Sequence, residues 1–390
     1  MFRRLMVTAK VRESRTITSF HLQPVDSRQW RAFEPGQFLV FKIPAENDHG
    51  HVLRNYSISS SPGRTGSYRI TVKREAAPLA GVPDGLSSRY LHDNVSVGDE
   101  LIAEGPRGDF QLDHTSPRPV VLLSGGVGLT PLVSMLHALA RKTERRVYFI
   151  HACDNGEVHA LVDEVRELAA LRSGLTLHTC YRFPTAVDLA AGRHDSEGVI
   201  TAEVLQRVLP LDDYDVYLCG PPPFMQGLYR TLRELGVPKH RIAYEFFGPA
   251  TVLETPQSGE ATSTPPVRAG APVLAPPAVT TATVPAAAAP TAATPAAAMR
   301  AAAMPAQAIT VEFRKSGRSV VWEDAKSLLD FAEKQGLSPE FSCRAGVCGS
   351  CKAALLEGEV VYFQEPLDAP EEGSVLICSC KPKGSIVVDL

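Results

Sequence analysis

The sequence of 390 residues lacks any long apolar run and any strong excess of charge. Charged side chains interrupt the first twenty residues, and this pattern excludes a secretory signal. No later stretch reaches the length that a transmembrane helix needs, so we expect no membrane insertion. The net charge of -3 gives no reason to expect nucleic acid or an anionic membrane as a partner.

Eight cysteines without a secretory signal indicate a reducing compartment, where thiols bind metal or pack as small apolar residues. We therefore expect the cytoplasm. The apolar content of 44% is ordinary, and a chain of this length is expected to hold two or three domains. No internal repeat is visible.

One domain boundary is set by a segment with almost no aromatic residues. Residues 251–308 consist mainly of Ala, Pro, Thr and Val, and prolines such as Pro290 and Pro295 interrupt the alanine runs. Such a segment cannot bury enough surface to offset the entropy of ordering it. We predict an Ala/Pro-rich disordered linker, which as a flexible coil spans on the order of 40 Å.

Two different patterns precede the linker. Residues 1–113 show short apolar stretches separated by turn signals, such as Pro35-Gly36 and Pro62-Gly63, which predict a small antiparallel β-barrel with one helix. Residues 114–250 alternate strands with helices, which predicts an α/β domain with a parallel sheet covered on both faces. After the linker, residues 309–390 mix short strands with one helix, which predicts a small α+β domain.

The expected elements are as follows. In the barrel we expect strands at 5–11, 16–22, 37–43, 53–59, 67–74 and 100–103, and a helix at 86–93. In the α/β domain we expect strands at 120–123, 147–151, 175–181, 216–219 and 242–246, and helices at 130–142, 157–170, 202–208 and 222–235. In the last domain we expect a hairpin at 309–313 and 319–322, a helix at 327–335 and a final strand at 386–389.

The last domain carries a cysteine loop. Cys343, Cys348 and Cys351 have the spacing C-x4-C-x2-C, and Cys378 and Cys380 follow further on. Three thiolates in one glycine-bearing loop plus one distant thiolate is the ligand spacing of a plant-type [2Fe–2S] cluster. A disulfide or zinc site is the alternative, although zinc ligands usually come as two C-x2-4-C pairs. Spacing alone does not decide between Cys378 and Cys380 as the fourth ligand.

Two places in the barrel could bind an anion. Arg54 and Tyr56 alternate along a strand and so lie on one face, about 7 Å apart, where a guanidinium can bind a diphosphate and a ring can pack on a heterocycle. Gly85, Ser87 and Ser88 open the lone helix, whose N-terminal amides favour an anion. The alternatives are an ordinary exposed strand and simple capping by Ser87. Together the two places favour a dinucleotide such as FAD.

A glycine-rich turn follows the first strand of the α/β domain. Gly126 and Gly128 let backbone amides approach a pyrophosphate, although Pro131 stands where the G-x-G-x-x-G fingerprint has its third glycine. A plain turn is the alternative. Cys219-Gly220-Pro221 ends the fourth strand and should border the same cleft, since ligands bind at the carboxyl ends of such strands. Cys219 could instead be a small buried apolar residue.

These motifs together resemble the ferredoxin–NADP reductase superfamily. The residues that carry the resemblance are Arg54-x-Tyr56-Ser57, Gly85-x-x-Ser88, Gly125-Gly126-x-Gly128-x-Thr130-Pro131, Cys219-Gly220-Pro221 and Tyr244-Glu245-Phe246-Phe247. The first two domains look most like the reductase half of flavohaemoglobins, and we expect no globin before a barrel that begins at Met1. The tail resembles the β-grasp-like ferredoxin domain of hybrid-cluster-protein reductases and of related oxygenase reductases.

The resemblance implies a role for each motif in the first two domains. Arg54, Tyr56 and Ser57 would hold the flavin, with Ser57 near its reactive nitrogen, and Gly85 and Ser88 would bind the FAD diphosphate. The residues that would seat the nicotinamide dinucleotide are Gly126, Gly128, Thr130, Cys219, Gly220 and Pro221. The residues that would act at the reacting rings are Ser57, Cys219, Glu245 and Phe247.

The resemblance also bears on the cluster ligands and on the nicotinamide. In this kind of ferredoxin domain the fourth ligand lies four residues before a proline, which selects Cys378 and leaves Cys380 spare. Family members that use NADPH often carry a Ser-Arg pair after the third strand, where this chain has Tyr181-Arg182. We favour NADH, while Arg182 leaves room for NADPH.

The expected function is electron transfer from NADH through FAD and a [2Fe–2S] cluster to an external redox protein, either an oxygenase component or a hybrid-cluster protein. Residues 309–390 hold nine basic and thirteen acidic side chains, a net charge of -4, which favours a basic docking surface on that partner. We expect a monomer. The alternatives are a self-sufficient NADH oxidase or diaphorase and a redox-sensing iron–sulfur flavoprotein, although a sensor needs no nicotinamide site.

Overall fold

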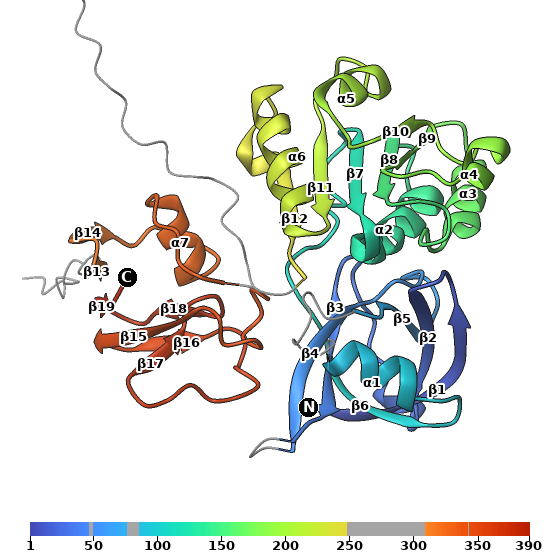
Figure 1. Ribbon diagram of the computed structural model, residues 1–390. Helices are drawn as coiled ribbons and strands as arrows, with labels where there is room; N and C mark the ends of the chain where they lie inside the picture. Colours follow the sequence, from blue (N-terminus) through green and yellow to red (C-terminus); the bar gives the residue numbers. More distant parts are fainter. Residues whose placement is uncertain (47–49, 76–85, 248–308, 342) are drawn as a thin grey trace, which may run out of the picture. The chain divides into compact units, whose positions relative to one another are not determined.

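The computed structural model describes residues 1–46, 50–75, 86–247, 309–341 and 343–390 (Figure 1). The predicted linker, residues 251–308, and Gly85 lie outside the described residues. None of the helices in these ranges is long and apolar enough to cross a membrane.

The first domain is built on six antiparallel strands in the order β4-β3-β6-β1-β2-β5. Their bounds are β1 Arg3–Arg12, β2 Ile17–Pro24, β3 Phe38–Pro44, β4 His51–Ser57, β5 Tyr68–Lys73 and β6 Glu100–Arg107. A bridge between Ile58 and Ile70 joins the end of β4 to β5 and closes the barrel. Phe20, Leu39 and Phe41 point inward and are fully buried. The predicted antiparallel barrel is confirmed.

A single helix, α1 (Leu86–Asn94), lies against this barrel. Leu91 is its fully buried anchor. The ammonium of Lys10 on β1 donates hydrogen bonds to the carbonyls of His92 and Val95, both at 2.7 Å. A cation at the C-terminus of a helix satisfies its free carbonyls, so these contacts hold α1 in place.

The second domain is a six-stranded parallel sheet in the order β10-β9-β8-β7-β11-β12. Its strands are β7 Val120–Gly125, β8 Val147–Cys153, β9 Leu175–Tyr181, β10 Ser196–Glu197, β11 Asp215–Cys219 and β12 Ile242–Glu245. The chain moves outward from β7 in one direction and then returns to add β11 on its other side. Such a reversal leaves a crevice between β7 and β11 at the carboxyl ends of the strands.

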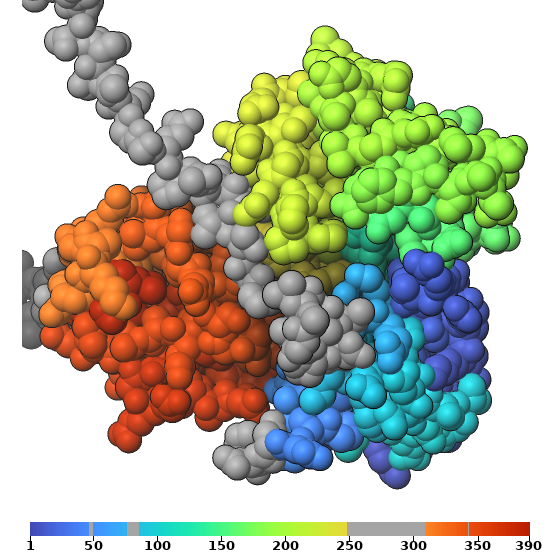
Figure 2. All heavy atoms as spheres, viewed as in Figure 1, coloured from blue at the N-terminus to red at the C-terminus, as the bar shows by residue number. Residues whose placement is uncertain are grey.

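Helices cover both faces of this sheet. They are α2 Leu129–Lys142, α3 Val162–Ala170, α4 Ala186–Ala191, α5 Ala202–Val208 and α6 Pro222–Glu234. Residues of α2 and α3 pack into the core on one face, and residues of α5 and α6 pack into the core on the other (Figure 1). The outer sides of α5 and α6 form part of the surface (Figure 2). The predicted parallel sheet with two covered faces is confirmed.

One helix begins later than the sequence pattern indicates. We expected a helix from residue 157, but α3 begins at Val162. Leu161 has a left-handed backbone with φ 57°, which ends any helix running into it. The preceding loop turns His159 inward, where its Nδ1 lies 3.0 Å from the hydroxyl of Tyr181.

A partly buried ionic cluster joins the barrel to the α/β domain. Arg69 of β5 binds Glu164 of α3 at 2.5 Å, and His137 of α2 lies at the same distance from the other carboxylate oxygen. Burial of Glu164 raises its pKa, but the hydrogen bonds from His137 and Arg69 outweigh burial and bring the pKa to about 2. The Ser134 hydroxyl of α2 also donates to the Ser60 carbonyl at 3.0 Å.

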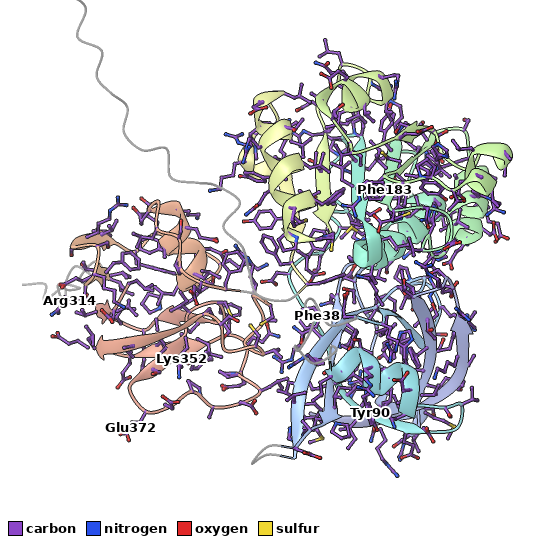
Figure 3. All side chains as sticks on the ribbon, in the orientation of Figure 1. Phe38, Tyr90, Phe183, Arg314, Lys352 and Glu372 are labelled. Atoms are coloured by element: carbon purple, nitrogen blue, oxygen red, sulfur yellow. The ribbon has the colours of Figure 1, made fainter. Side chains whose placement is uncertain are left out.

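The C-terminal domain has a five-stranded mixed sheet in the order β14-β13-β19-β15-β17 and a separate pair, β16 with β18. The elements are β13 Thr310–Phe313, β14 Arg318–Val321, α7 Leu328–Lys334, β15 Lys352–Glu357, β16 Val360–Tyr362, β17 Ser374–Leu376, β18 Cys380–Pro382 and β19 Ile386–Val388. Phe313 and Phe331 pack between sheet and helix. Charged residues such as Arg314, Lys352 and Glu372 lie on the surface (Figure 3).

Candidate functional site

Strand β4 carries the side chains expected around the flavin. Arg54 is exposed, and its guanidinium donates to the neighbouring Leu53 carbonyl at 2.7 Å. Tyr56 packs edge-on against Phe41, with ring centroids 5.8 Å apart, and burial raises the pKa of its phenol. Ser57 ends the strand and is buried. The strand therefore presents a cation and a fixed aromatic ring on one face.

The N-terminus of α1 holds an unsatisfied hydroxyl. The Ser87 Oγ is buried and has no hydrogen-bond partner among the described residues. The neighbouring Ser88 hydroxyl accepts a hydrogen bond from the Glu75 amide at 3.1 Å. A buried hydroxyl without a partner costs free energy unless a ligand binds it. Together with the exposed Arg54, this N-terminus fits the diphosphate of FAD.

The glycine-rich turn and the turn after β11 meet across the crevice of the parallel sheet. A short 3-10 turn, Gly126–Gly128, leads from β7 into α2. A Cβ on Gly128 would lie 2.3 Å from the Cys219 carbonyl oxygen, so only glycine lets the two turns approach this closely. Gly126 has φ 54° and open space around its Cα. The buried Thr130 hydroxyl donates to the Val127 carbonyl at 3.2 Å and holds the turn against α2.

A phenylalanine ring covers the other glycines of the two turns. A Cβ on Gly125 or Gly220 would lie 2.9 or 2.6 Å from the ring of Phe224. Pro221 provides the N-cap position of α6. The turns are thus locked together, and α2 begins directly after them with no side-chain cap at its N-terminus. A helix N-terminus after a glycine-rich turn is the arrangement that suits a pyrophosphate.

Three residues expected at the reacting rings lie together. The Ser57 hydroxyl donates to Glu245 Oε2 at 3.4 Å, and Glu245 pairs with Cys219 in the register of β11 and β12. Cys219 is fully buried, and burial, with the charge of Glu245, raises the pKa of its thiol well above the ordinary value. Phe247 follows β12 and is 39% exposed. The barrel and the parallel sheet therefore contribute side chains to one site.

Glu245 is the most strongly perturbed carboxyl of this site. Although its side chain keeps some contact with solvent, desolvation raises its pKa to about 8 against the opposing effect of the Ser57 hydrogen bond. The carboxyl is therefore protonated at neutral pH.

Replacing Glu245 with glutamine is expected to flatten the pH dependence of stability. The folded pKa of about 8 lies above the ordinary 4.5, so the folded protein holds the proton more tightly. The stabilisation is complete below about pH 4.5 and is lost as the pH rises through about 8. Thermal unfolding of the FAD-loaded protein across this range measures the loss. Glu234→Gln, at the exposed end of α6, is the control; equal pH profiles for wild type and Glu245→Gln would contradict the assignment.

The cysteine loop surrounds its sulfur atoms with backbone amides. The Sγ of Cys343 accepts hydrogen bonds from the amides of Ala345, Val347 and Cys348, each at 3.4 Å. The Gly346 amide donates to the Sγ of Cys378 at 3.4 Å. Amide hydrogen bonds to the sulfurs stabilise the negative charge of an iron–sulfur cluster and tune its potential. All eight cysteines are free in this structure.

Cys378 and Cys380 differ in their surroundings. The thiol of Cys378 lies beside the thiols of Cys343 and Cys351, and the thiol of Cys343 also lies beside that of Cys348. Cys380 lies on β18, opposite Tyr362, and is fully buried among apolar side chains. The structure thus brings Cys343, Cys348, Cys351 and Cys378 together, and this set of four thiols fits a two-iron cluster.

Arg344 fixes the shape of the loop. It has φ 48°, an unusual backbone for a residue with a side chain. Its guanidinium binds Glu333 at 2.6 Å and Asp330 at 3.0 Å on α7, and it stacks on Phe341 at 3.9 Å. These contacts offset the backbone strain and anchor the loop to the helix.

The loop also contacts the barrel. Ala345 and Val347 form an apolar cluster with Phe38 and Val40 of β3. Arg107, at the end of β6, donates to the carbonyls of Ala345 and Glu365, both at 3.3 Å, and pairs with Glu104. Lys326 binds Asp109 at 2.9 Å. Sequence analysis missed these residues because nothing in the sequence pattern marks contacts more than 200 positions apart.

Comparison with known families accounts for all three domains. The family described as "Oxidoreductase FAD-binding domain" matches residues 4–112, and "Oxidoreductase NAD-binding domain" matches residues 122–230. The family described as "2Fe-2S iron-sulfur cluster binding domain" matches residues 311–383. The site residues described above fall in these domains, apart from the end of β12 and Phe247.

Individual relatives place the first two domains more closely. A flavohemoprotein of Bacillus cereus is 44% identical over 254 residues, which is 65% of this chain and 62% of that protein. The FAD/NAD-binding domain of nitric oxide dioxygenase from Vibrio cholerae is 36% identical, with a TM-score of 0.56, over 63% of this chain and 98% of that structure. Phthalate dioxygenase reductase shares the fold of the whole chain, with a TM-score of 0.52 at 23% identity, over 100% of this chain and 98% of that one.

The chain belongs to the ferredoxin–NADP reductase superfamily, in its flavohaemoglobin-reductase-like branch, and carries a C-terminal 2Fe-2S domain. It is an NAD(P)H-dependent oxidoreductase whose cofactors are FAD, a nicotinamide dinucleotide and a [2Fe–2S] cluster. The chain spans about 62% of the length of the flavohemoproteins that it matches.

Proposed function

We propose that this protein is a reductase that moves electrons from NADH, by way of FAD and the [2Fe–2S] cluster, to a separate protein acceptor. The observation that supports it most directly is the packing of Ala345 and Val347, in the cluster loop, against Phe38 and Val40 of β3. This packing places the cysteine loop, which would hold the one-electron cluster, against the domain that matches the FAD-binding family.

In this proposal the side chains hold and orient the reactants. Arg54 and Ser88 bind the diphosphate of FAD, and Tyr56 supports its ring. The turns at Gly128 and Cys219 position the nicotinamide, and the protonated Glu245 holds the Ser57 hydroxyl. Bound FAD supplies the conversion that the cluster needs, because it takes two electrons from a nicotinamide and releases them one at a time. Precise orientation is what such a site contributes to rate.

The acceptor that we propose is a separate redox protein, either an oxygenase component or a hybrid-cluster protein. The net charge of -4 over residues 309–390 supports a partner with a basic docking surface. The composition of residues 251–308 supports a flexible tether, which would let the ferredoxin domain reach that partner at high effective concentration. We propose a monomer in the cytoplasm.

An anaerobic titration with NADH tests this function. The purified full-length protein, loaded with FAD and cluster, is expected to lose both flavin and iron–sulfur absorption and to show the paramagnetic signal of a reduced cluster. Reduction of the flavin with the cluster left oxidised would contradict the proposal. Rapid oxygen consumption without any added acceptor would indicate an NADH oxidase instead.

We further propose NADH as the preferred nicotinamide. Arg182, which follows β9, pairs with Asp154 at 2.7 Å and stacks on the exposed Phe183 at 4.7 Å (Figure 3). A paired arginine beside a carboxylate is a poor site for a 2′-phosphate, because the carboxylate repels it and already occupies the guanidinium.

Replacing Asp154 with asparagine is expected to raise kcat/KM for NADPH about tenfold, equivalent to about 1.4 kcal/mol, because it frees Arg182 and removes a repelling charge. Steady-state rates with both nicotinamides measure the change. Asp163→Asn, on the exposed side of α3, is the matched control and should leave the ratio unchanged. If Asp154→Asn kept the wild-type preference between NADH and NADPH, the adenosine ribose would not lie beside Arg182, and this part of the proposal would be wrong.

A further inference from the structure

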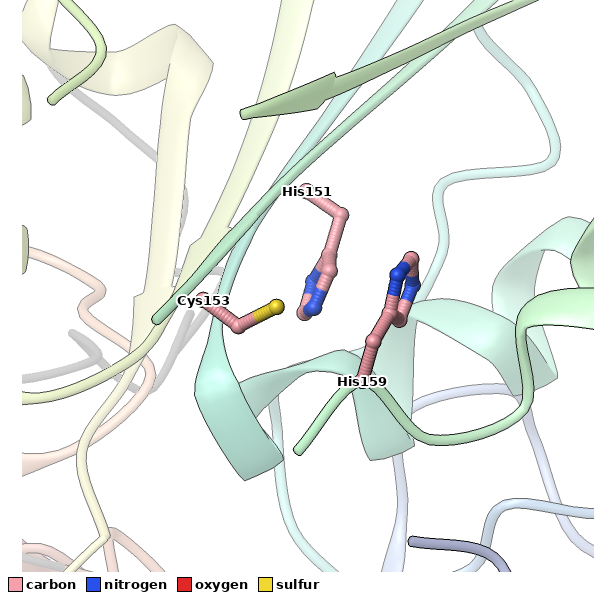
Figure 4. Close-up of side chains that lie close together, drawn as sticks. All are labelled: His151, Cys153 and His159. Atoms are coloured by element: carbon pink, nitrogen blue, oxygen red, sulfur yellow. The ribbon is translucent and has the colours of Figure 1, made fainter. Parts of the chain in front are cut away.

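Three side chains with ligand atoms for transition metals meet at the end of strand β8. His151 and Cys153 are two residues apart on this strand and so share one face. His159 reaches them from the loop before α3. One ligand atom from each lies within 4.8 Å of those of the other two. The Sγ of Cys153 points toward the ring of His151, and the ring of His159 lies on the far side of that ring (Figure 4).

Hydrogen bonds orient both imidazoles through the same ring nitrogen. Ser124 Oγ lies 2.8 Å from His151 Nδ1, and the Tyr181 hydroxyl lies 3.0 Å from His159 Nδ1. This leaves Nε2 as the ligand atom of each ring. His151 is 2% exposed, and its Nε2 has no partner among the described residues. Outer hydrogen bonds of this kind, on the nitrogen that does not bind metal, fix the ring in metal sites.

We propose that His151, Cys153 and His159 form a binding site for one zinc ion in the nucleotide-binding domain, separate from the [2Fe–2S] cluster. Two imidazole nitrogens and one thiolate are ligands that Zn²⁺ prefers, whereas calcium and magnesium require oxygen ligands. On binding, the Cys153 thiol releases its proton to solvent and its sulfur forms the bond to zinc.

Room for the ion and for its fourth ligand lies next to the two rings. A cavity of about 190 Å³ is lined by His151 and His159 and also by Arg166, His178 and Arg193. The rings are stacked at 4.5 Å with an angle of 27° between their planes. Because a metal lies in the plane of each imidazole ligand, binding turns the His159 ring out of the stack and into the cavity, at the cost of its hydrogen bond with Tyr181, while Ser124 keeps the His151 ring in place. A water or small anion would take the fourth position.

The bound ion would fasten a loop that borders the proposed nucleotide site. His159 and Asp154 belong to the same connection between β8 and α3, and Asp154 pairs with Arg182. The Cys153 carbonyl accepts a hydrogen bond from the Arg182 amide at 2.9 Å. Zinc would therefore tie β8, this connection and the end of β9 into one rigid unit. An ion bound only by the folded state raises the unfolding temperature.

Equilibrium dialysis of the full-length protein, carrying FAD and cluster, against ZnCl₂ tests the site. We expect one zinc per chain, and an X-ray absorption spectrum at the zinc edge that shows two nitrogen neighbours, one sulfur and one further light atom. Cys153→Ala is expected to weaken zinc binding by at least about tenfold and to remove the sulfur, since the loss of outer hydrogen bonds alone costs 10–100-fold. Added zinc should raise the unfolding temperature of wild type but not of this variant.

Two further variants complete the comparison. Cys180 is a buried cysteine on the neighbouring strand β9, and its thiol donates a hydrogen bond to the Gly198 carbonyl. Cys180→Ala should therefore bind zinc like wild type. His159→Gln removes a second ligand and should weaken binding as Cys153→Ala does, so a folding defect in one variant leaves the other as the test. Zinc surrounded by four sulfurs would mean binding at the cluster loop. That spectrum, the absence of bound zinc, or wild-type affinity in Cys153→Ala would each overturn the proposal.

Discussion

Replacing Cys378 with alanine is expected to abolish the [2Fe–2S] cluster and, with it, electron transfer to one-electron protein acceptors. The Cys378 thiol lies beside the thiols of Cys343 and Cys351 and accepts a hydrogen bond from the Gly346 amide, so its loss leaves a two-iron cluster one ligand short. Reduction of the flavin by NADH should remain at the wild-type rate. Iron content, the paramagnetic signal of the reduced protein and the rate of cytochrome c reduction measure the effect.

Cys380→Ala is the matched control for this experiment. Cys380 stands two residues away and is fully buried in the same apolar core, but it lies on β18, where it is paired with Tyr362 rather than with the cluster loop. Its replacement removes one sulfur from that core and should leave iron content and electron transfer intact. A cluster that survives in Cys378→Ala and disappears in Cys380→Ala would reverse the ligand assignment.

Replacing Gly128 with alanine is expected to slow reduction of the flavin by NADH on the order of 100-fold. The new Cβ would lie 2.3 Å from the Cys219 carbonyl oxygen and 2.7 Å from the Gly220 amide nitrogen, so the two turns must separate. A displacement of about 1 Å at a hydride-transfer site can cost about 100-fold in rate. Stopped-flow reduction under anaerobic conditions measures the rate, and the flavin content shows whether FAD is retained.

Gly227→Ala is the control for a glycine changed without a clash. Gly227 lies in α6 and has no heavy atom within 4 Å of a Cβ placed on it. Alanine is the better helix former by about 1 kcal/mol, so this variant should react like wild type and be at least as stable. If Gly128→Ala reduced its flavin at the wild-type rate, the contact between the turns would have no part in placing the nicotinamide.

Most of the fold follows from local patterns in the sequence. The strand β9 and the helix α5 begin and end where the spacing of apolar residues indicates. Burial of one face requires a period of two residues in a strand and of 3.6 residues in a helix. The helix α4 was missed although its signal was present. Thr185 and Asp188 form a capping box, with each side chain bonding the backbone of the other, and that spacing is readable in sequence.

The late start of α3 had no such signal. Leu161 adopts a left-handed backbone, and a leucine in the sequence gives no hint of that conformation. The hydrogen bond between Ser57 and Glu245 was equally hidden. It joins residues 188 positions apart on two domains, so only the fold brings them together.

The candidate site was predicted where a motif carries its own geometry. The spacing of Cys343, Cys348 and Cys351 already specifies a loop, and the glycines after β7 already specify a turn. The ionic cluster of Arg69, His137 and Glu164 has no motif, because each member comes from a different element. The same is true of Ser87, whose unsatisfied hydroxyl is visible only once its surroundings are known.

Arg107 contacts the C-terminal domain through backbone atoms. Its guanidinium holds the carbonyls of Ala345 and Glu365, which every amino acid provides, rather than particular side chains. Substitution of Ala345 or Glu365 would therefore keep these two hydrogen bonds, whereas substitution of Val347 or Lys326 would change contacts that depend on the side chain.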